Sequence, residues 1–259
     1  MPDFKSAFRA LVFSSSCLLG QPVAAEALSL VTGNEYPPFT GSDLAGGGVL
    51  TELVRQAFDA SGTAIDIDFK PWTRGYEETL RLGYDATFPY LSTPRRTADF
   101  LFSEPLYQLS LRLYVRRDSP WQTGSPKEMR NATFCLPAGY EVSGWIRAES
   151  DRLVFVRPRS MAQCHAMLQL GRVDVVVSNP DELAWQAVPP KLTLPNVRAL
   201  PEPLADVTLH LIVPRAHPDA QALLSTFNAG LQRLVSSGAR DQLFRSNPEY
   251  RRVFDAADH

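Results

Sequence analysis

The residues best suited to chemistry lie in one arginine-bearing turn. Its sequence is Thr93-Pro94-Arg95-Arg96, and an apolar stretch leads from there to Tyr107. A guanidinium presents parallel N–H donors to both oxygens of a carboxylate, so an arginine held in such a turn can clamp an anionic group. An isolated turn of this kind more often carries solvated arginines. The motifs around the turn therefore have to decide between a binding site and an ordinary surface.

Metal ligands and catalytic groups do not gather anywhere in the sequence. His210, His217 and His259 are scattered without ligand spacing, and His165 is the only histidine beside a cysteine, Cys164. Histidines placed in this way are more often packing or surface residues than metal ligands. No nucleophile with an adjacent base stands out either. The sequence therefore predicts neither a metal nor another cofactor.

The N-terminus has the pattern of a secretory signal peptide. Lys5 and Arg9 precede an apolar run over residues 10–20, and small residues at 23–25 offer a cleavage site. Eleven mildly apolar residues are too few to span a bilayer as a helix. Cys17 raises the alternative of a lipoprotein, but the three serines before it make a poor lipobox. We expect residues 1–25 to be removed and the mature protein to be periplasmic.

Composition and charge exclude several partners. The whole chain carries a net charge of −2, and removal of Asp3, Lys5 and Arg9 with the leader changes it to −2 − (+1) = −3. This balance gives no electrostatic footprint for nucleic acid or for an anionic membrane surface. A hydrophobic content of 44% is ample for packed cores. We expect a soluble protein, and a monomer.

Two cysteines remain after cleavage, Cys135 and Cys164. An even pair in an oxidising compartment is more often a disulfide than two free thiols. Cys135 falls on an expected strand and Cys164 on the helix that precedes the next strand, so both can face one helix–sheet seam. We expect the two to be bonded.

Strand and helix patterns alternate along the chain in two units. In the first, strands are expected over 28–31, 65–69 and 86–88, with helices over 50–58 and 76–82. In the second, strands are expected over 111–115, 131–136 and 171–177, with a turn at 137–140 that opens a helix and another helix over 160–170. A strand over 209–213 and an amphipathic helix over 223–235 follow. This order predicts an α/β fold with mostly parallel sheets.

Four motifs occur in the order of a known family. They are Y-P-P-F at 36–39, the T-P-x-R turn with its apolar stretch, G-R-V-D at 171–174 and S-G-x-x-D-x-L-F at 237–244. The chain thereby resembles the family 3 periplasmic solute-binding proteins, the soluble receptors of polar amino-acid ABC importers. The resemblance implies a two-lobed periplasmic binding protein fold of type II. Lobe 1 would comprise 26–108 and 207–259, and lobe 2 would comprise 109–206, with hinge crossings near 107–110 and 204–207.

The resemblance also implies which residues line the cleft. Arg96 matches the arginine that clamps the solute carboxylate, and Tyr36 stands where family members put an aromatic ring against the ligand. Tyr36 could equally be buried in its own turn. Further candidates come from the loop 71–75 and from two turns of the facing lobe: Trp72, Arg74, Gly139, Tyr140, Asn179 and Asp181. Arg74 would add a second cation to the pocket or lie on a solvated face.

Two positions depart from the family pattern. Leu91 stands where a Ser or Thr often helps to hold the carboxylate, and Asn179 stands where many amino-acid binders place an Asp for the α-ammonium group. A neutral amide lacks the charge that makes a buried ammonium pair worthwhile. Asp181, Glu141 or Glu35 could substitute. We therefore expect an acidic, weakly cationic or non-amino solute.

Two functions follow from these observations. The first is capture of a small polar, carboxylate-bearing solute between two lobes, for an ABC permease in the inner membrane or for a membrane-bound sensor. The second is a periplasmic enzyme, because the same fold supports cyclohexadienyl dehydratases. Such an enzyme needs a general acid in the cleft, for which Glu141 or Asp181 is available.

Overall fold

The structure, a computed structural model, describes residues 27–187 and 196–257. The expected signal peptide at 1–25 and Cys17 lie outside the described residues. None of the helices within 27–187 and 196–257 has the length and apolar content needed to cross a bilayer.

Lobe 1 is built on three parallel strands. The elements in chain order are β1 (Leu28–Gly33), η1 (Ala45–Gly47), α1 (Val49–Ala60), β2 (Ile65–Lys70), α2 (Trp72–Leu80), β3 (Ala86–Leu91), α3 (Pro94–Asp99) and β4 (Phe100–Phe102). Strand β1 pairs in parallel with both β2 and β3. The predicted strands at 28–31, 65–69 and 86–88 are therefore confirmed, because alternating or continuous apolar residues pack on one or both faces of a sheet.

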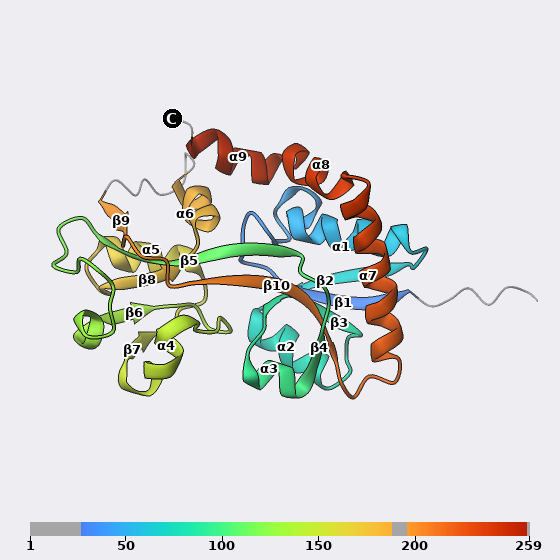
Figure 1. The fold of residues 1–259 in the computed structure, drawn as a ribbon, viewed down its shortest axis with the longest axis horizontal. Coiled ribbons are helices and arrows are strands. Elements are labelled where there is room, and N and C mark those ends of the chain that lie inside the picture. The colour runs from blue at the N-terminus through green and yellow to red at the C-terminus, as the bar shows by residue number, and fades with distance from the viewer. Residues whose placement is uncertain (1–26, 188–195, 258–259) are drawn as a thin grey trace, which may run out of the picture.

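Two long strands connect the lobes. They are β5 (Tyr107–Arg116) and β10 (Ala205–Pro214), which pair antiparallel with each other. Within lobe 1, β10 also pairs with β3, and in the second lobe β5 also pairs with β8. The sheet thus runs continuously in the order β2-β1-β3-β10-β5-β8-β6-β7. Figure 1 shows both strands crossing the centre of the molecule, which confirms the two predicted hinge crossings.

Lobe 2 repeats the α/β pattern. Its elements are η2 (Glu128–Asn131), β6 (Thr133–Cys135), α4 (Gly144–Glu149), η3 (Ser150–Arg152), β7 (Val154–Val156), α5 (Met161–Gln169), β8 (Val175–Ser178), α6 (Pro180–Ala187) and β9 (Val197–Ala199). Strand β6 pairs in parallel with β7 and β8. The expected disulfide joins Cys135 on β6 to Cys164 on α5, with the Cα atoms 5.5 Å apart.

Three helices complete the chain. They are α7 (Ala220–Ser236), α8 (Ala239–Ser246) and α9 (Pro248–Ala257). Helix α7 packs closely on α1, because a Cβ atom at Gly230 would lie 1.8 Å from the carbonyl oxygen of Ala57. Helices α8 and α9 then pass from lobe 1 toward α6 of lobe 2 (Figure 1).

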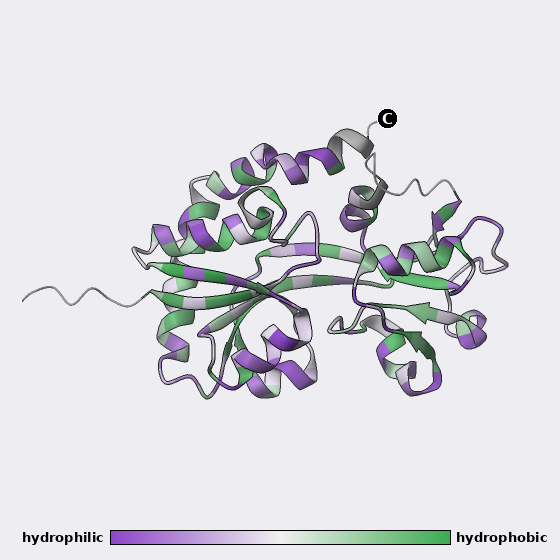
Figure 2. Cartoon of the chain, turned by 180° about the vertical axis from the view of Figure 1, so that it is seen from behind, coloured by the Kyte–Doolittle hydropathy of each residue, from purple (hydrophilic) through white to green (hydrophobic). Residues whose placement is uncertain are grey.

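Each lobe has its own hydrophobic core. One core includes Leu30, Phe58 and Phe227, and the other includes Phe134, Val176 and Leu168. The central strands are largely hydrophobic, whereas the helices alternate between hydrophobic and hydrophilic residues (Figure 2). The lobe boundaries expected at 108/109 and 206/207 fall inside β5 and β10, and they stay a prediction.

Two details of the predicted elements were wrong. Residues 71–75, expected as a loop, enter α2, which begins at Trp72. The turn at 137–140 does not open a helix directly, because α4 begins only at Gly144. Gly75 explains the first error: its backbone lies so close to β1 that a Cβ would be 3.2 Å from a methyl group of Val31. The glycine is there for helix–sheet packing rather than for a turn.

Candidate functional site

A cavity of about 370 Å³ lies between the two lobes. Lobe 1 contributes residues of β3, α2 and α3, and lobe 2 contributes the turn after β6 and the first residue after β7. The lining residues are Trp72, Thr73, Tyr76, Glu77, Tyr90, Arg95, Arg96, Ala138, Gly139, Tyr140, Glu141 and Arg157. This volume suits a small solute.

Arg96 is the most buried charged residue of this cavity, with 4% of its surface exposed. It lies in α3, whose first turn is capped by Thr93: the Thr93 hydroxyl oxygen accepts a hydrogen bond from the Arg96 backbone N–H at 3.3 Å. The guanidinium donates to the carbonyl oxygens of Leu91 and Gly139, both at 3.2 Å. One acceptor belongs to lobe 1 and the other to lobe 2. Arg96 therefore sits where the lobes meet.

The charge of Arg96 has no counterion. Among residues 27–187 and 196–257, no carboxylate forms an ion pair with its guanidinium. Burial lowers the pKa of Arg96, and the guanidinium carbon lies 4.7 Å from the centroid of the Tyr90 ring. A buried cation with only neutral acceptors and aromatic faces is costly, and an anion placed beside it would remove that cost.

Three aromatic rings pack against one another at the junction of the lobes, and two of them, Trp72 and Tyr140, line the cavity. Tyr36 lies 6.0 Å from Trp72 and 5.6 Å from Tyr140, and Trp72 lies 6.0 Å from Tyr140, all in edge-to-face arrangements. Gly139 permits this packing, because a Cβ at its positive φ of 85° would lie 2.6 Å from Trp72 Cβ. The structure thus brings four of the predicted residues, Tyr36, Trp72, Gly139 and Tyr140, to the junction of the lobes.

Asn179 also lies at this junction, but its amide is engaged. Its Nδ2 atom donates to the Tyr36 hydroxyl at 3.4 Å, and its Oδ1 atom accepts from the backbone N–H of Glu182 at 3.0 Å. The second bond satisfies an N–H in the first turn of α6. Asn179 thus joins the lobes through Tyr36 while it caps a helix.

Glu182 is a buried carboxyl group that the sequence analysis missed. It is 1% exposed, and it accepts hydrogen bonds from the Ser178 hydroxyl at 3.0 Å and from the Tyr140 hydroxyl at 3.5 Å. Within the described part of the chain it has no ion-pair partner. Burial raises the pKa of Glu182 to about 8, so the group is largely protonated at neutral pH.

Two predicted residues lie elsewhere. The side chain of Arg74 is 68% exposed and pairs with Glu78 at 2.7 Å, so it does not reach the cavity as a second cation. Asp181 accepts a hydrogen bond from the Tyr107 hydroxyl at 2.7 Å on the hinge side of α6. Of the three acids proposed to replace the missing charge at Asn179, only Glu141 lines the cavity.

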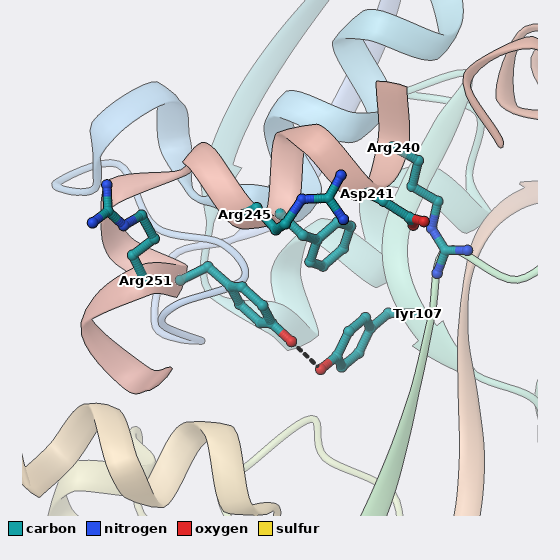
Figure 3. Close-up of a pocket in the computed structure, with 7 residues that line it drawn as sticks. Tyr107, Arg240, Asp241, Arg245 and Arg251 are labelled. Carbon is teal, nitrogen blue, oxygen red and sulfur yellow. Dashed lines mark hydrogen bonds between the residues drawn. The ribbon is translucent and has the colours of Figure 1, made fainter. Parts of the chain in front are cut away.

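A second cavity, of about 560 Å³, lies beneath α8 and α9 (Figure 3). Its lining residues are Tyr107, Arg240, Asp241, Phe244, Arg245, Tyr250 and Arg251, none of which lines the cavity at Arg96. Tyr107 stacks on Phe244 with 5.4 Å between centroids, and its hydroxyl lies 2.6 Å from that of Tyr250. Because Tyr107 also bonds to Asp181, this cluster links α9, the hinge strand β5 and lobe 2.

The described histidines take no part in a metal site. No group of three or more His, Cys, Asp or Glu side chains is placed to hold a metal ion within 27–187 and 196–257. His165 is fully buried in lobe 2, where desolvation lowers its pKa to about 4. It is a core residue.

Comparison with known proteins was made at three levels. The sequence profile of the bacterial extracellular solute-binding proteins, family 3, matches residues 28–247. None of the curated proteins compared with this sequence matches it significantly.

Solved structures show the same fold. The GluR0 ligand-binding core from Nostoc punctiforme, in complex with L-glutamate, superposes with a TM-score of 0.71 at 18% identity, covering 86% of this chain and 99% of that one. A histidine kinase sensor domain with similarity to periplasmic binding proteins gives 0.72 at 18% identity, over 86% and 96%. The amino-acid ABC transporter protein AbpA from Streptococcus pneumoniae, bound to L-arginine, gives 0.71 at 16% identity, over 90% and 96%. At these identities the likeness concerns the fold alone.

Proposed function

Because the chain belongs to the bacterial extracellular solute-binding proteins of family 3, we propose that it captures a small carboxylate-bearing solute between its lobes and delivers it to an ABC importer. Its family consists of solute-binding proteins rather than enzymes, which removes the basis for the dehydratase alternative. The matched profile spans 28–247, so both lobes and both hinge strands are included.

One observation carries the proposal: Arg96 is buried at the meeting point of the lobes without a counterion. Its guanidinium has five N–H donors, and neutral carbonyl oxygens occupy only some of them. A carboxylate in the adjacent cavity would take the remaining donors and neutralise the charge. Since Arg96 already reaches across to Gly139, the same group would connect solute binding to closure of the lobes.

The aromatic residues support the same function. Trp72 and Tyr140 line the cavity together with Arg96, Tyr36 packs on both rings, and Gly139 lets Trp72 approach the turn of lobe 2. Solute pockets are mostly apolar with a few well-placed polar groups, and this cleft has that composition. Asn179 completes the lobe 2 side. Asp181 does not line the cavity, and it acts on solute binding only through its hydrogen bond with Tyr107 of the hinge strand β5.

Delivery to an importer is inferred mainly from the proteins that this chain is similar to. AbpA belongs to an amino-acid ABC transporter, whereas another similar fold is the sensor domain of a histidine kinase. The expected signal peptide places this chain in the periplasm, where an inner-membrane permease can receive the solute. A membrane-bound sensor is the alternative partner.

A thermal-shift screen tests the capture of a solute. The full chain is melted with each common amino acid and with a set of organic acids, at concentrations far above the expected dissociation constants. A ligand present at about 100 times its Kd stabilises the native state by roughly 2.7 kcal/mol. The proposal requires at least one carboxylate to raise Tm, and it is wrong if neutral compounds do so while every carboxylate fails.

Uptake measurements test the partner. A strain that lacks this protein should import the radiolabelled solute more slowly than its parent, and expression of the protein should restore import. Normal uptake together with loss of a transcriptional response to the solute would instead favour the sensor.

A further inference from the structure

Arg157 brings a guanidinium of lobe 2 to the Arg96 cavity, which Arg95 and Arg96 line from lobe 1. It follows β7 of lobe 2, whereas Arg96 lies in α3 of lobe 1, and both residues line the same cavity of about 370 Å³. Neither the family motifs nor the sequence pattern singled it out.

One turn of lobe 2 holds both guanidiniums. Arg96 donates to the carbonyl oxygen of Gly139 at 3.2 Å, and Arg157 donates to the carbonyl oxygen of Tyr140 at 3.0 Å. These acceptors belong to consecutive residues, so the same turn anchors both side chains. Arg157 also makes a cation–π contact with Phe155, and its guanidinium carbon lies 4.7 Å from the ring centroid. An anion in the shared cavity would be attracted by both cations.

The acids of the cavity do not neutralise this pair. Glu77 pairs with Arg81 at 3.4 Å on the surface of α2. Glu141 is near enough to raise the pKa of both arginines, but within the described ranges it forms no ion pair with either. Burial outweighs that effect and lowers the pKa of Arg96 and of Arg157. Arg157 is exposed to solvent, and neither guanidinium has a carboxylate partner within the described ranges.

Other lining residues add donors rather than acceptors. The indole Nε1 of Trp72 and the hydroxyl of Tyr76 are buried, and neither has a hydrogen-bond partner among the described residues. A cavity lined by three guanidiniums, an indole N–H and a phenol matches a ligand rich in anionic oxygens.

We propose that Arg157 and Arg96 hold the same solute from opposite lobes, and that the solute is a small dicarboxylate. The inference rests on the proposed function and narrows its ligand class. A monocarboxylate needs only Arg96 of lobe 1. A second carboxylate gains its partner only when lobe 2 closes, so a dicarboxylate binds the closed form better and thereby drives closure.

Matched ligand pairs test the proposal. The full chain is titrated calorimetrically with succinate and succinamate, and with glutamate and glutamine, because each pair differs by one negative charge at nearly constant size. We expect the wild type to prefer at least one diacid over its monoamide by about 10- to 100-fold, the range for a hydrogen-bonded charged group. In Arg157→Gln this preference should fall below about threefold. Arg159→Gln is the control, because this nearby arginine is exposed, as Arg157 is, but lies outside the cavity and should leave the preference unchanged.

The outcomes separate this inference from the proposed function. A wild type that binds a carboxylate through Arg96 but prefers the monoamide, or an Arg157→Gln variant that keeps the preference for the diacid, overturns the inference alone. If no carboxylate binds the folded wild type, the proposed function fails as well. A preference that disappears equally in Arg159→Gln would reflect the general field of the protein and would also contradict a specific role for Arg157.

Discussion

Two buried ionisable residues, Arg96 and Glu182, face the junction of the lobes without an opposite charge. They meet the cost of burial in different ways. Arg96 keeps its proton and uses backbone carbonyls and the Tyr90 ring, since a guanidinium does not deprotonate in proteins. Glu182 takes up a proton instead, as buried carboxyl groups do. The cleft therefore carries a net positive character at neutral pH, which favours an anionic solute.

Glu182 should make the stability of the protein depend on pH. Its folded-state pKa of about 8 exceeds the ordinary value of 4.5, so the native state retains a proton that the unfolded chain releases between those values. The free energy of unfolding should therefore fall as the pH rises from 5 to 8 and then level off. Relative to Glu182→Gln, the wild type should lose on the order of 3–5 kcal/mol over this range.

Denaturant unfolding at pH 5, 6, 7, 8 and 9 measures this difference. Glu141→Gln is the control, because its carboxylate is only partly buried and lines the rim of the cavity. Wild-type and Glu182→Gln curves that run parallel across the whole pH range would refute the assignment.

For the exposed residue Arg74, unlike buried Glu182, we expect substitution to have almost no effect. Its side chain is mostly exposed and pairs with Glu78 on the outer face of α2. Exposed pairs of this kind contribute little to stability. Arg74→Ala should therefore leave Tm and solute affinity nearly unchanged, which a thermal melt and a titration beside the wild type can establish. A large loss of affinity would place Arg74 in the cleft after all.

The sequence predicted some of these residues because their signals are local. Arg96 stands in a T-P-x-R turn, where capping by Thr93 is readable from the residue types. Glu182 was not predicted as a site residue because Asn179-Pro180-Asp181-Glu182 has the spacing of a helix-capping pair, which is an ordinary structural signal. Only the packing of α6 against Tyr140 shows that this carboxyl group faces the cleft. Arg157 escaped for a similar reason, since nothing near it in sequence marks a site.

At the scale of elements, the disulfide joins the two layers of lobe 2. Cys135 and Cys164 are both fully buried, and they fasten β6 to α5. The loop that the bond closes has a sequence separation of 29 residues. The bond therefore acts mainly by restricting the conformational freedom of the unfolded chain.

Loss of this disulfide should destabilise the protein. In the chain-entropy account a loop of this length contributes about 3–4 kcal/mol. The double variant Cys135→Ser, Cys164→Ser should lose that amount in denaturant unfolding, whereas a reductant should have no further effect on it. Peptide mapping of non-reduced wild type should recover the linked pair. Two thiols that alkylate freely in native protein would contradict the bond.

The contact between Tyr107 and Asp181 should favour the closed lobes. Tyr107 begins the hinge strand β5, and its hydroxyl donates to Asp181 of α6 in lobe 2. A hydrogen bond to a charged group contributes roughly 1.5–3 kcal/mol, which corresponds to about 10- to 100-fold in affinity if only the closed form has it. Tyr107→Phe should weaken solute binding by up to this factor.

Tyr250→Phe is the matched control for this prediction. It removes the hydroxyl next to Tyr107 but leaves the bond from Tyr107 to Asp181 in place. Its effect on Kd should be clearly smaller. Equal Kd values for the wild type and Tyr107→Phe would show that the hinge contact does not distinguish open from closed lobes.

Hydrophobic periodicity predicted most elements, but not their ends. The helix expected at 50–58 and the strand expected at 65–69 lie within α1 and β2, since burial on one face sets both patterns. The beginning of α2 was missed because Pro71 and Gly75 resemble loop residues. Pro71 precedes the first helical residue, where its missing N–H costs nothing.

At the scale of the whole molecule, two cores are joined by β5 and β10 and by the passage of α9 toward α6. The order of motifs predicted the two lobes and their crossings. It could not predict how the lobes meet, because the contacts of Arg96 with Gly139 and of Tyr36 with Asn179 join residues 43 and 143 positions apart. Such contacts depend on three-dimensional packing and leave no periodic signal.

Calorimetric titration of wild type, Arg96→Ala and Arg95→Ala with the best carboxylate from the thermal-shift screen tests the central claim most directly. Truncating one partner of a buried, hydrogen-bonded charge pair costs about 2–5 kcal/mol, or roughly 30- to 5,000-fold in affinity. Arg96→Ala should therefore lose detectable binding while it keeps a cooperative melt. Arg95→Ala should change affinity far less, because Arg95 lines the same cavity but is exposed to solvent, whereas Arg96 is buried. Binding that is as tight in folded Arg96→Ala as in the wild type would contradict capture of the solute by Arg96.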